Sequence, residues 1–385
     1  MIPDGLQMLQ GLAPEIILVA GGIIVLLTGL APPRATSSSA FILSMATAVF
    51  ALWWSWTTPV GVGVVATLHD DSLVWYARAL TLGVGLLILM SLRHVPEPNE
   101  RAEFFSLTLF SLAGISLVAI ANDLVLLFLA LELVSVPTYI LIGLSRRDIR
   151  AQEATGKYFF LGAFAAAITL YGFSFLYGAA GTTTLFSAAE GDPSIAAYLQ
   201  APSKAADKLF ILGLLLSIAG LAFKLAAVPL HFYVADVYQG AAAPVTGMLG
   251  FVPKFAGFLA LVRILTVTGW QYGEGLFWLL WAMAAVTMTV GNTLALMQHN
   301  VKRMLAYSSV AHSGYMLVGL LAGPGPRDNP SAGPLSSGLT AVLFYMAIYA
   351  VMNLGAFAVL SLFRKPGDVE EDAAESLEDI AGVAT

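Results

Sequence analysis

The sequence predicts an all-α protein that crosses a membrane many times. Hydrophobic residues make up 58% of the 385 residues and charged residues only 11%, a composition that excludes a soluble globular protein. Apolar runs of spanning length recur along the whole chain. One of these runs contains a lysine followed by a proline, which indicates that this helix is broken within the membrane.

Eleven apolar runs define the expected membrane helices, with boundaries good to a few residues. The stretch 103–144 is about twice the length of one span, and Asn122 and Asp123 mark the hairpin between its two helices. The eleven runs are residues 14–32, 39–57, 73–92, 103–121, 123–144, 153–179, 208–229, 243–267, 276–297, 303–322 and 337–363.

The distribution of basic residues predicts the orientation of the chain. With the N-terminus outside, ten of the 18 Lys and Arg residues fall in inner loops and the tail, and three fall in outer loops. This bias predicts an external N-terminus and a cytoplasmic segment 364–385. The inner set is Arg34, Arg93, Arg101, Arg146, Arg147, Arg150, Lys302, Arg303, Arg364 and Lys365, and the outer set is Lys204, Lys208 and Arg327.

The N-terminal and C-terminal segments carry few functional signals. The first 13 residues contain Asp4 but no Lys or Arg, so they do not resemble a cleavable signal peptide. The longest outer loop, about 180–207, shows no catalytic constellation. The acidic tail from Pro366 has two interpretations, a solvated terminus or a connector toward a further helix.

Six charged side chains fall inside the apolar runs, at least four residues from either end of the run. Glu132, Lys224 and Lys254 lie near mid-depth by residue count, whereas Lys157 lies nearer the inner face and is expected to snorkel partly. A functional role is the default for such residues, and a buried ion pair that holds helices together is the alternative. The remaining two, Arg78 and Arg263, are interpreted as interfacial anchors.

The segment 221–254 concentrates the features that favour a functional interpretation. Lys224 is followed by Pro229, then by His231, and Lys254 lies in the next apolar run. A broken helix at membrane depth is tolerated where its backbone is buried or lines a water-filled cavity. His231 could instead be a satisfied core histidine. His312 lies mid-helix among small and hydroxyl residues, which also serve ordinary helix packing.

These residue types are suited to proton transfer. Lysine readily changes its pKa when buried, and a carboxylate and imidazoles complete a set that can pass protons along water chains. The sequence has no phosphate-binding loop or nucleophile arrangement, and it has no cysteine to hold an iron–sulfur cluster. The residues alone therefore predict a proton channel or an antiporter module.

Two stretches carry a family resemblance. FKLAAVPLHFYVADVYQGAAAPV (223–245) and VKRMLAYSSVAHSGYM (301–316) resemble the antiporter-like membrane subunits of proton-pumping NADH:quinone oxidoreductase, or complex I. Together with APEIILVAGGIIVLL near the N-terminus, the short overall plan is most similar to the subunit N family. The resemblance covers essentially the whole chain, although the motif at 223–246 is shared with membrane-bound hydrogenases and multisubunit cation/proton antiporters.

The resemblance implies a fold of about fourteen helices with two inverted repeats of five helices, each containing one broken helix. Residues 1–100 would form helices 1–3, residues 101–268 the complete first repeat with broken helix 7, and residues 269–385 a partial second repeat. SLEDIAG (376–382) resembles the connector to helix 12, so the chain is expected to stop before the last three helices. The family's proton-translocating residues fall on Glu132, Lys157, Lys224, His231, Lys254 and His312.

The resemblance also implies a function, partners and a location. The chain would move protons in a bacterial inner membrane, coupled to quinone reduction in partner membrane subunits of complex I. NAD, FMN, iron–sulfur clusters and quinone would be held by those partners, with no cofactor, metal or nucleic acid bound here. The alternatives are a cation/proton antiporter or hydrogenase subunit, and a truncated scaffold that does not pump. Tyr233 and Ala235 depart from the Trp and Pro usual in the family, at positions expected not to touch the titrating groups.

Overall fold

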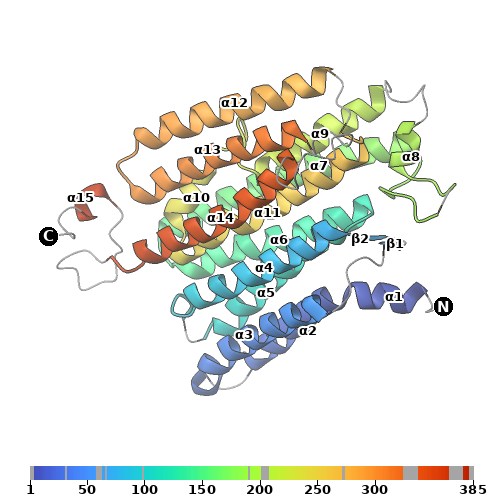
Figure 1. Ribbon diagram of the computed structural model, residues 1–385. Helices are drawn as coiled ribbons and strands as arrows, with labels where there is room; N and C mark the ends of the chain where they lie inside the picture. Colours follow the sequence, from blue (N-terminus) through green and yellow to red (C-terminus); the bar gives the residue numbers. More distant parts are fainter. Residues whose placement is uncertain are drawn as a thin grey trace.

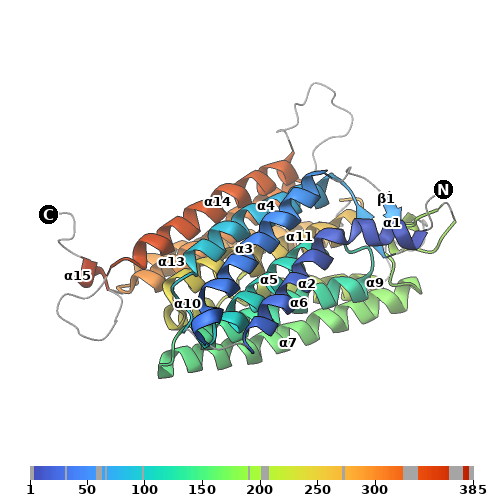
Figure 2. The same ribbon diagram turned by 90° about the horizontal axis from the view of Figure 1, so that it is seen from below.

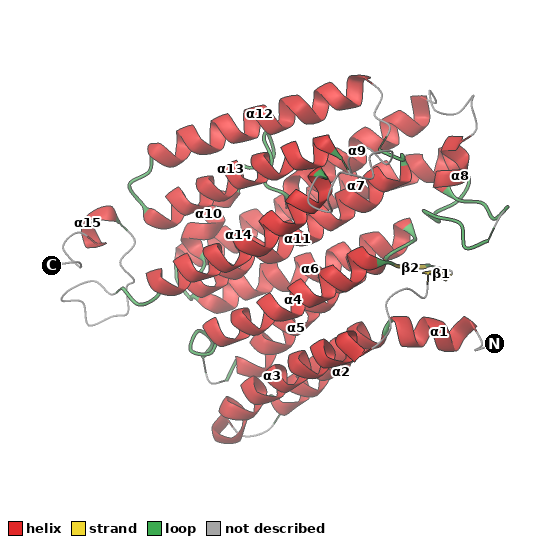
Figure 3. Cartoon of the chain, in the orientation of Figure 1, coloured by secondary structure: helices red, strands yellow, loops and turns green. Residues whose placement is uncertain are grey.

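A computed structural model describes residues 4–30, 33–57, 63–65, 67–97, 99–189, 191–200, 208–270, 274–323, 337–363 and 376–380. Eleven longer helices within these residues run along a common direction and form one bundle (Figures 1 and 3). They are α2 (Ala13–Thr28), α3 (Pro33–Thr57), α4 (Ser72–Ser91), α5 (Arg101–Ile120), α6 (Leu124–Ser145), α7 (Ile149–Ala180), α9 (Lys208–Lys224), α11 (Ala243–Val267), α12 (Glu274–Leu296), α13 (Val301–Ala322) and α14 (Gly338–Leu360).

These helices confirm the predicted all-α membrane fold. Nine of the described helices are long and apolar enough to cross a membrane, and the other two of the eleven, α2 and α9, are apolar helices of 16 and 17 residues. Every predicted run coincides with one helix. The largest differences are that α3 begins six residues before the predicted residue 39 and that α9 ends at Lys224, five residues before the predicted 229.

Short elements at the helix ends were not predicted from the sequence. Two strands, β1 (Gly63–Val65) and β2 (Leu68–Asp70), pair antiparallel before α4. The short helices are α1 (Asp4–Gly11), α8 (Ile195–Gln200), α10 (Val234–Gly240) and α15 (Leu377–Ile380). In the tail, the amide of Leu377 donates to the carbonyl of His299, so α15 lies beside the α12–α13 connection. The rest of the tail, 364–375 and 381–385, lies outside the described residues.

Polar residues at the predicted turns begin several helices. Asp123 accepts hydrogen bonds from the amides of Val125 and Leu126 at the start of α6, which confirms the hairpin expected at Asn122–Asp123. Asp148 caps α7 and Asn300 caps α13 in the same way. Each cap satisfies amides that have no partner within their own helix, a requirement that is strict where water is scarce.

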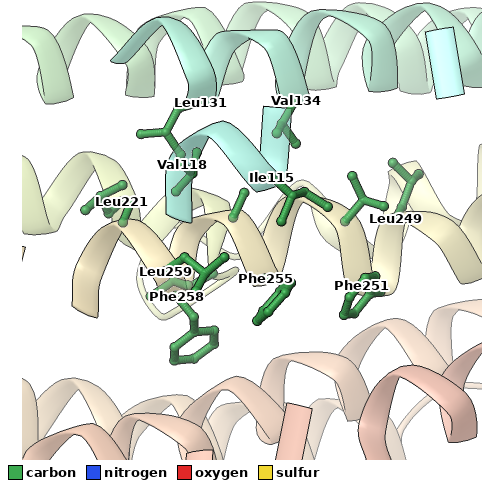
Figure 4. Packing of buried hydrophobic residues seen from close by; sticks show 14 of the residues in the cluster. Ile115, Val118, Leu131, Val134, Leu221, Leu249, Phe251, Phe255, Phe258 and Leu259 are labelled. Atoms are coloured by element: carbon green, nitrogen blue, oxygen red, sulfur yellow. The ribbon is translucent and has the colours of Figure 1, made fainter. Parts of the chain in front are cut away.

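Helix α11 lies at the centre of the bundle (Figure 2). All of its 18-residue apolar window is buried, compared with 28% for α3 and 22% for α12. Figure 4 shows the rings of Phe251, Phe255 and Phe258 on the side of α11 that faces away from α5 and α6. A helix that is apolar on all sides is expected to be enclosed by other helices. The outward apolar faces of α3, α7, α12 and α14 suit contact with lipid.

Small residues let the helices approach closely. A methyl group on Gly172 of α7 would lie 2.5 Å from the backbone nitrogen of Ser217 on α9, and one on Gly213 would lie 2.8 Å from the nitrogen of Leu176. Such close backbone contact is a main source of helix association in membranes, because the hydrophobic effect does not drive helices together in lipid. This packing fixes α9, and with it the side chain at its last residue, Lys224.

Two arginines expected to be interfacial anchors are instead buried in ion pairs. The guanidinium of Arg78 in α4 binds both carboxylate oxygens of Glu15 in α2 at 2.9 Å. Arg263 in α11 is 1% exposed and binds Asp71 at 2.9 Å. In both cases a carboxylate from a neighbouring segment pairs with the buried arginine. The Glu15 side chain is 3% exposed and the Asp71 side chain 33%.

Candidate functional site

The discontinuity predicted in the apolar run 208–229 lies between Lys224 and Val234. Helix α9 ends at Lys224, residues 225–233 are non-helical, and α10 begins at Val234. The backbone in this segment is satisfied locally, since the amide of Ala227 donates to the carbonyl of Ala222 at 2.9 Å and that of Val228 donates to the Thr287 hydroxyl of α12 at 3.0 Å. The break is therefore a built feature that places Lys224 at a helix end inside the bundle.

Lys224 and Glu132, both expected near mid-depth from the sequence, form an ion pair within the bundle. The ammonium nitrogen of Lys224 lies 3.3 Å from Oε1 of Glu132 and also donates to the Ser135 hydroxyl, both on α6. Lys224 is 6% exposed, and the Glu132 side chain is 24% exposed. The hydroxyl of Ser135, one turn along α6, completes the site. The pairing of Ser135 with Lys224 was not anticipated from the sequence.

Lys254 lies in a different environment one helix away. Its ammonium nitrogen donates to the carbonyl and hydroxyl of Ser309 and to the hydroxyl of Ser313 at 3.0 Å, both on α13. Lys254 is 2% exposed, and the nitrogen lies 5.9 Å from the ring centre of Tyr349. Among the residues that the structure describes, no carboxylate pairs with it. Lys224 and Lys254 thus differ in having charged and neutral partners respectively.

The backbones of the two lysines approach each other at Gly257. A methyl group on Gly257 of α11 would lie 3.1 Å from Cβ of Lys224, and Gly257 follows Lys254 by one helical turn. The absence of a side chain at Gly257 brings α9 and α11 together here. No direct hydrogen bond joins the two ammonium groups in the described part of the chain.

The two predicted histidines have different surroundings. His312 of α13 is hydrogen-bonded through Nδ1 to the Tyr345 hydroxyl at 2.6 Å, and its ring centre lies 5.0 Å from that of Tyr349. Because Tyr349 also faces Lys254, His312 belongs to the Lys254 region. His231 lies in the non-helical segment, and its buried Nδ1 has no hydrogen-bond partner among the described residues. No hydrogen bond within those residues joins His231 to either lysine, so the predicted link through it remains a prediction.

Lys157 belongs to a separate cluster near the start of α7. Its ammonium nitrogen lies 2.7 Å from Oδ2 of Asp236 and 2.7 Å from Oε1 of Glu153, and its side chain is 40% exposed, in accord with partial snorkelling. The other oxygen of Asp236 binds Arg303 at 2.6 Å. An open polar cavity of about 200 Å³ adjoins this cluster. It is lined by Arg150, Glu153, Ala154, Lys157, Asp236, Gln239 and Gly240.

Helix α10 is fastened to α13 by residues that sequence analysis did not single out. Lys302, assigned to an inner loop from the sequence, is 1% exposed and donates to the carbonyl of Ala241 at 3.0 Å. Arg303 binds both Asp236 and the side chain of Gln239. The signal for Asp236 was present, since it lies in the motif at 223–245, but its partners come from distant segments that no local pattern identifies.

A further buried cluster occupies the end of the bundle that holds the β1–β2 pair. Arg263 donates to Asp71 and to the backbone carbonyls of Ala119 and His69. Burial first, and then the neighbouring Arg263, hold the pKa of His69 below its ordinary value, against the opposing effect of Asp71 and Asp70. This cluster joins α11 to α4 and α5 and serves their packing.

Comparison with known proteins agrees with the fold. Residues 121–383 match the family described as NADH:quinone oxidoreductase/Mrp antiporter, TM. The chain therefore belongs to this family of antiporter-like membrane proteins. Within it, NADH-quinone oxidoreductase subunit N of Trichlorobacter lovleyi is 37% identical, with 94% of this chain and 71% of the relative covered. Subunit N of Myxococcus xanthus is 38% identical, covering 97% and 75%.

Solved structures give the same result. A chain of respiratory complex I from Thermus thermophilus is 32% identical with a TM-score of 0.70, covering 91% of this chain and 70% of that one. A chain of the Mrp complex from Dietzia is 21% identical with a TM-score of 0.72, covering 94% and 64%, and so shows the shared fold alone. The resemblance to subunit N predicted from the two motifs is confirmed.

Proposed function

We propose that this chain translocates protons as the subunit N of an NADH-quinone oxidoreductase. Redox chemistry takes place in partner subunits, which hold NAD, FMN, iron–sulfur clusters and quinone, and the chain works in contact with the other membrane subunits. The observation that carries the proposal is the Glu132–Lys224 pair at the broken helix, with N–O separation 3.3 Å and nearly complete burial of the lysine. Burying ionisable side chains within a membrane span costs free energy, so such a pair is expected to serve a function, here the movement of protons.

Each predicted site residue then has a role. Lys157, beside the polar cavity, exchanges protons with the inner aqueous side. Lys224 and Lys254 hold protons at mid-depth, with Glu132 modulating the first. His231 links the two lysines through water, and His312 lies on the route beyond Lys254. The neutral partners of Lys254 and the charged partner of Lys224 support this difference in role.

The organisation of the chain follows the same proposal. Residues 1–100 support the antiporter-like part, residues 101–268 form the first repeat, and residues 269–385 belong to the second repeat and its cytoplasmic tail. The shape of the bundle supports this division, since α9 and α10 provide one broken helix within the first repeat.

A direct test uses inside-out vesicles that contain the assembled complex. We expect NADH-driven proton uptake in the parent, and a lower number of protons per electron in Lys224→Met, while Lys208→Met keeps the parental ratio. Lys208 is the matched control because it begins the same helix and is exposed. Uptake that requires sodium and proceeds without NADH would favour the antiporter alternative. A parental ratio in Lys224→Met, with assembly checked by native gel, would leave the scaffold alternative.

The membrane is a bacterial inner membrane, and we place the N-terminus on its outer side. Helices α1 and α8 lie at one end of the bundle and α15 at the other (Figures 1 and 2), as eleven crossings require. Reporter tags after Arg147 and at the C-terminus should therefore report a cytoplasmic location, and a tag within 185–200 an external one. The reverse pattern in all three positions would invert the orientation. An external tag at the C-terminus, with a cytoplasmic tag after Arg147, would contradict the helix count.

A further inference from the structure

Helix α10 connects two of the sites described above. Asp236, in its first turn, is bound to Lys157 and Arg303 beside the polar cavity near the start of α7. We call this space the inner-end cavity, because the proposed orientation places it on the inner side of the membrane. Tyr238, two residues later, extends in another direction, and its hydroxyl lies 3.2 Å from the hydroxyl of Ser309 on α13. Ser309 is also a direct partner of Lys254. A helix of only seven residues therefore reaches from the polar cavity to the partners of the buried lysine.

The partners of Lys254 restrict how a proton can reach it. They are one carbonyl oxygen, which cannot pass on a proton, and the hydroxyls of Ser309 and Ser313. Within the described residues, the Ser313 hydroxyl donates back to the Ser309 carbonyl at 3.2 Å, which ends that branch. The Ser309 hydroxyl instead continues to Tyr238. Of the two branches, only the one through Ser309 leads to a second hydroxyl.

The surroundings of these hydroxyls suit a proton relay. Tyr238 is 3% exposed, Ser309 1% and Lys254 2%, so bulk water does not compete for their hydrogen bonds. The next two residues after Tyr238, Gln239 and Gly240, line the inner-end cavity. The relay therefore begins at a residue whose two successors in the chain line a water-accessible space, and it ends on a lysine nitrogen.

We propose that Tyr238 and Ser309 form a hydroxyl relay that delivers protons from the inner-end cavity to Lys254. The neutral amine of Lys254 takes the proton of the Ser309 hydroxyl, while the Ser309 oxygen takes the proton of Tyr238 and the Tyr238 oxygen takes one from a hydronium or water chain on the cavity side. One bond to hydrogen breaks and one forms at each oxygen, and the net result is one proton added to Nζ. This inference rests on the proposed proton translocation and adds an input for Lys254 that bypasses Lys224.

The test removes one hydroxyl and keeps the ring. Tyr238→Phe is expected to lower the protons taken up per electron several-fold for the portion carried by this chain, and to change the ratio of rates in H₂O and D₂O. Tyr233→Phe is the matched control, because Tyr233 is a buried tyrosine next to α10 whose hydroxyl donates to a backbone carbonyl, that of Phe223, at 2.8 Å. It should pump with the parental ratio and isotope effect.

A second pair of variants keeps the proposal testable if Tyr238→Phe fails to assemble. Ser309→Thr retains a hydroxyl and should keep most of the uptake, whereas Ser309→Ala should lower it. The relay is overturned if assembled Tyr238→Phe pumps with the parental ratio and isotope effect, or if Ser309→Ala equals Ser309→Thr. If the parent itself takes up no protons with NADH, the proposed function fails. If the parent pumps and Lys224→Met is impaired, a Tyr238→Phe variant that pumps like the parent overturns the relay and leaves the proposed function standing.

Discussion

Glu132→Gln is expected to slow proton translocation through this chain by at least about tenfold, with the complex still assembled. At the observed 3.3 Å, and with an effective dielectric near 20, the attraction between Glu132 and Lys224 is about 5 kcal/mol. If only about 1.4 kcal/mol of this attraction contributes to the activation barrier, its loss changes the rate tenfold. The neutral amide keeps the shape and a hydrogen-bonding oxygen, so the loss would report the charge.

The mechanism behind this expectation is a change in separation. If the pair opens from its present distance to about 10 Å, its attraction falls below roughly 2 kcal/mol, which alters the proton affinity of the lysine. Glu132→Asp should keep part of the activity, because the charge remains although the side chain is shorter. The measurement is proton uptake in vesicles with assembly checked by native gel. Normal proton stoichiometry in assembled Glu132→Gln would mean that the pair is structural.

Arg263→Met is expected to destabilise the bundle by about 3 to 5 kcal/mol, because it leaves buried polar groups without partners. Asp71 would lose two hydrogen bonds, of 2.9 and 3.1 Å, and the carbonyls of Ala119 and His69 would lose their donors. A loss of this size corresponds to a lower melting temperature by roughly 5 to 10 °C. Thermal unfolding of the purified complex, followed by circular dichroism, measures it.

The control for this prediction is an arginine at the surface. Arg147 forms ion pairs with Glu97 and Glu100, but its side chain is 66% exposed, so Arg147→Met should cost less than about 1 kcal/mol. Equal melting temperatures in the two variants would contradict the assignment of Arg263.

His69 gives the expected pH dependence of stability. Its pKa is lower in the folded chain, so its contribution to stability declines as pH falls through the ordinary value of 6.5.

The sequence predicted the helices and the mid-depth positions of Glu132 and Lys224 because both signals are local. That these two residues pair, 92 residues apart in the chain, depends on how the helices pack. Spanning length, a proline after Lys224 and the depth of each charge can be read within one run of residues. Helix ends were less certain, and α9 is shorter than its apolar run because residues 225–229 stay apolar after the helix has ended. An apolar run indicates burial but does not show where the backbone leaves the helix.

The buried arginines and the role of Lys302 could not be predicted, because their partners are remote in the chain. Asp71 is 192 residues from Arg263, and Glu15 is 63 residues from Arg78. Similarly, Lys302 binds the carbonyl of Ala241, 61 residues away. Hydrophobic patterns identify a cation inside an apolar run, but which carboxylate or carbonyl meets it depends on how the helices pack.

The enclosure of α11 has a consequence for biogenesis. This helix carries Lys254 and Arg263 and is covered by α5, α6 and α9 on one side and by α13 and α14 on the other. During synthesis the first three partners reach the membrane before α11, whereas Ser309 on α13 follows Lys254 by 55 residues. Lys254 therefore waits without its final hydrogen-bond partners while α12 and α13 are made. The newborn bundle must keep that side hydrated or shielded until α13 and α14 close over the lysine.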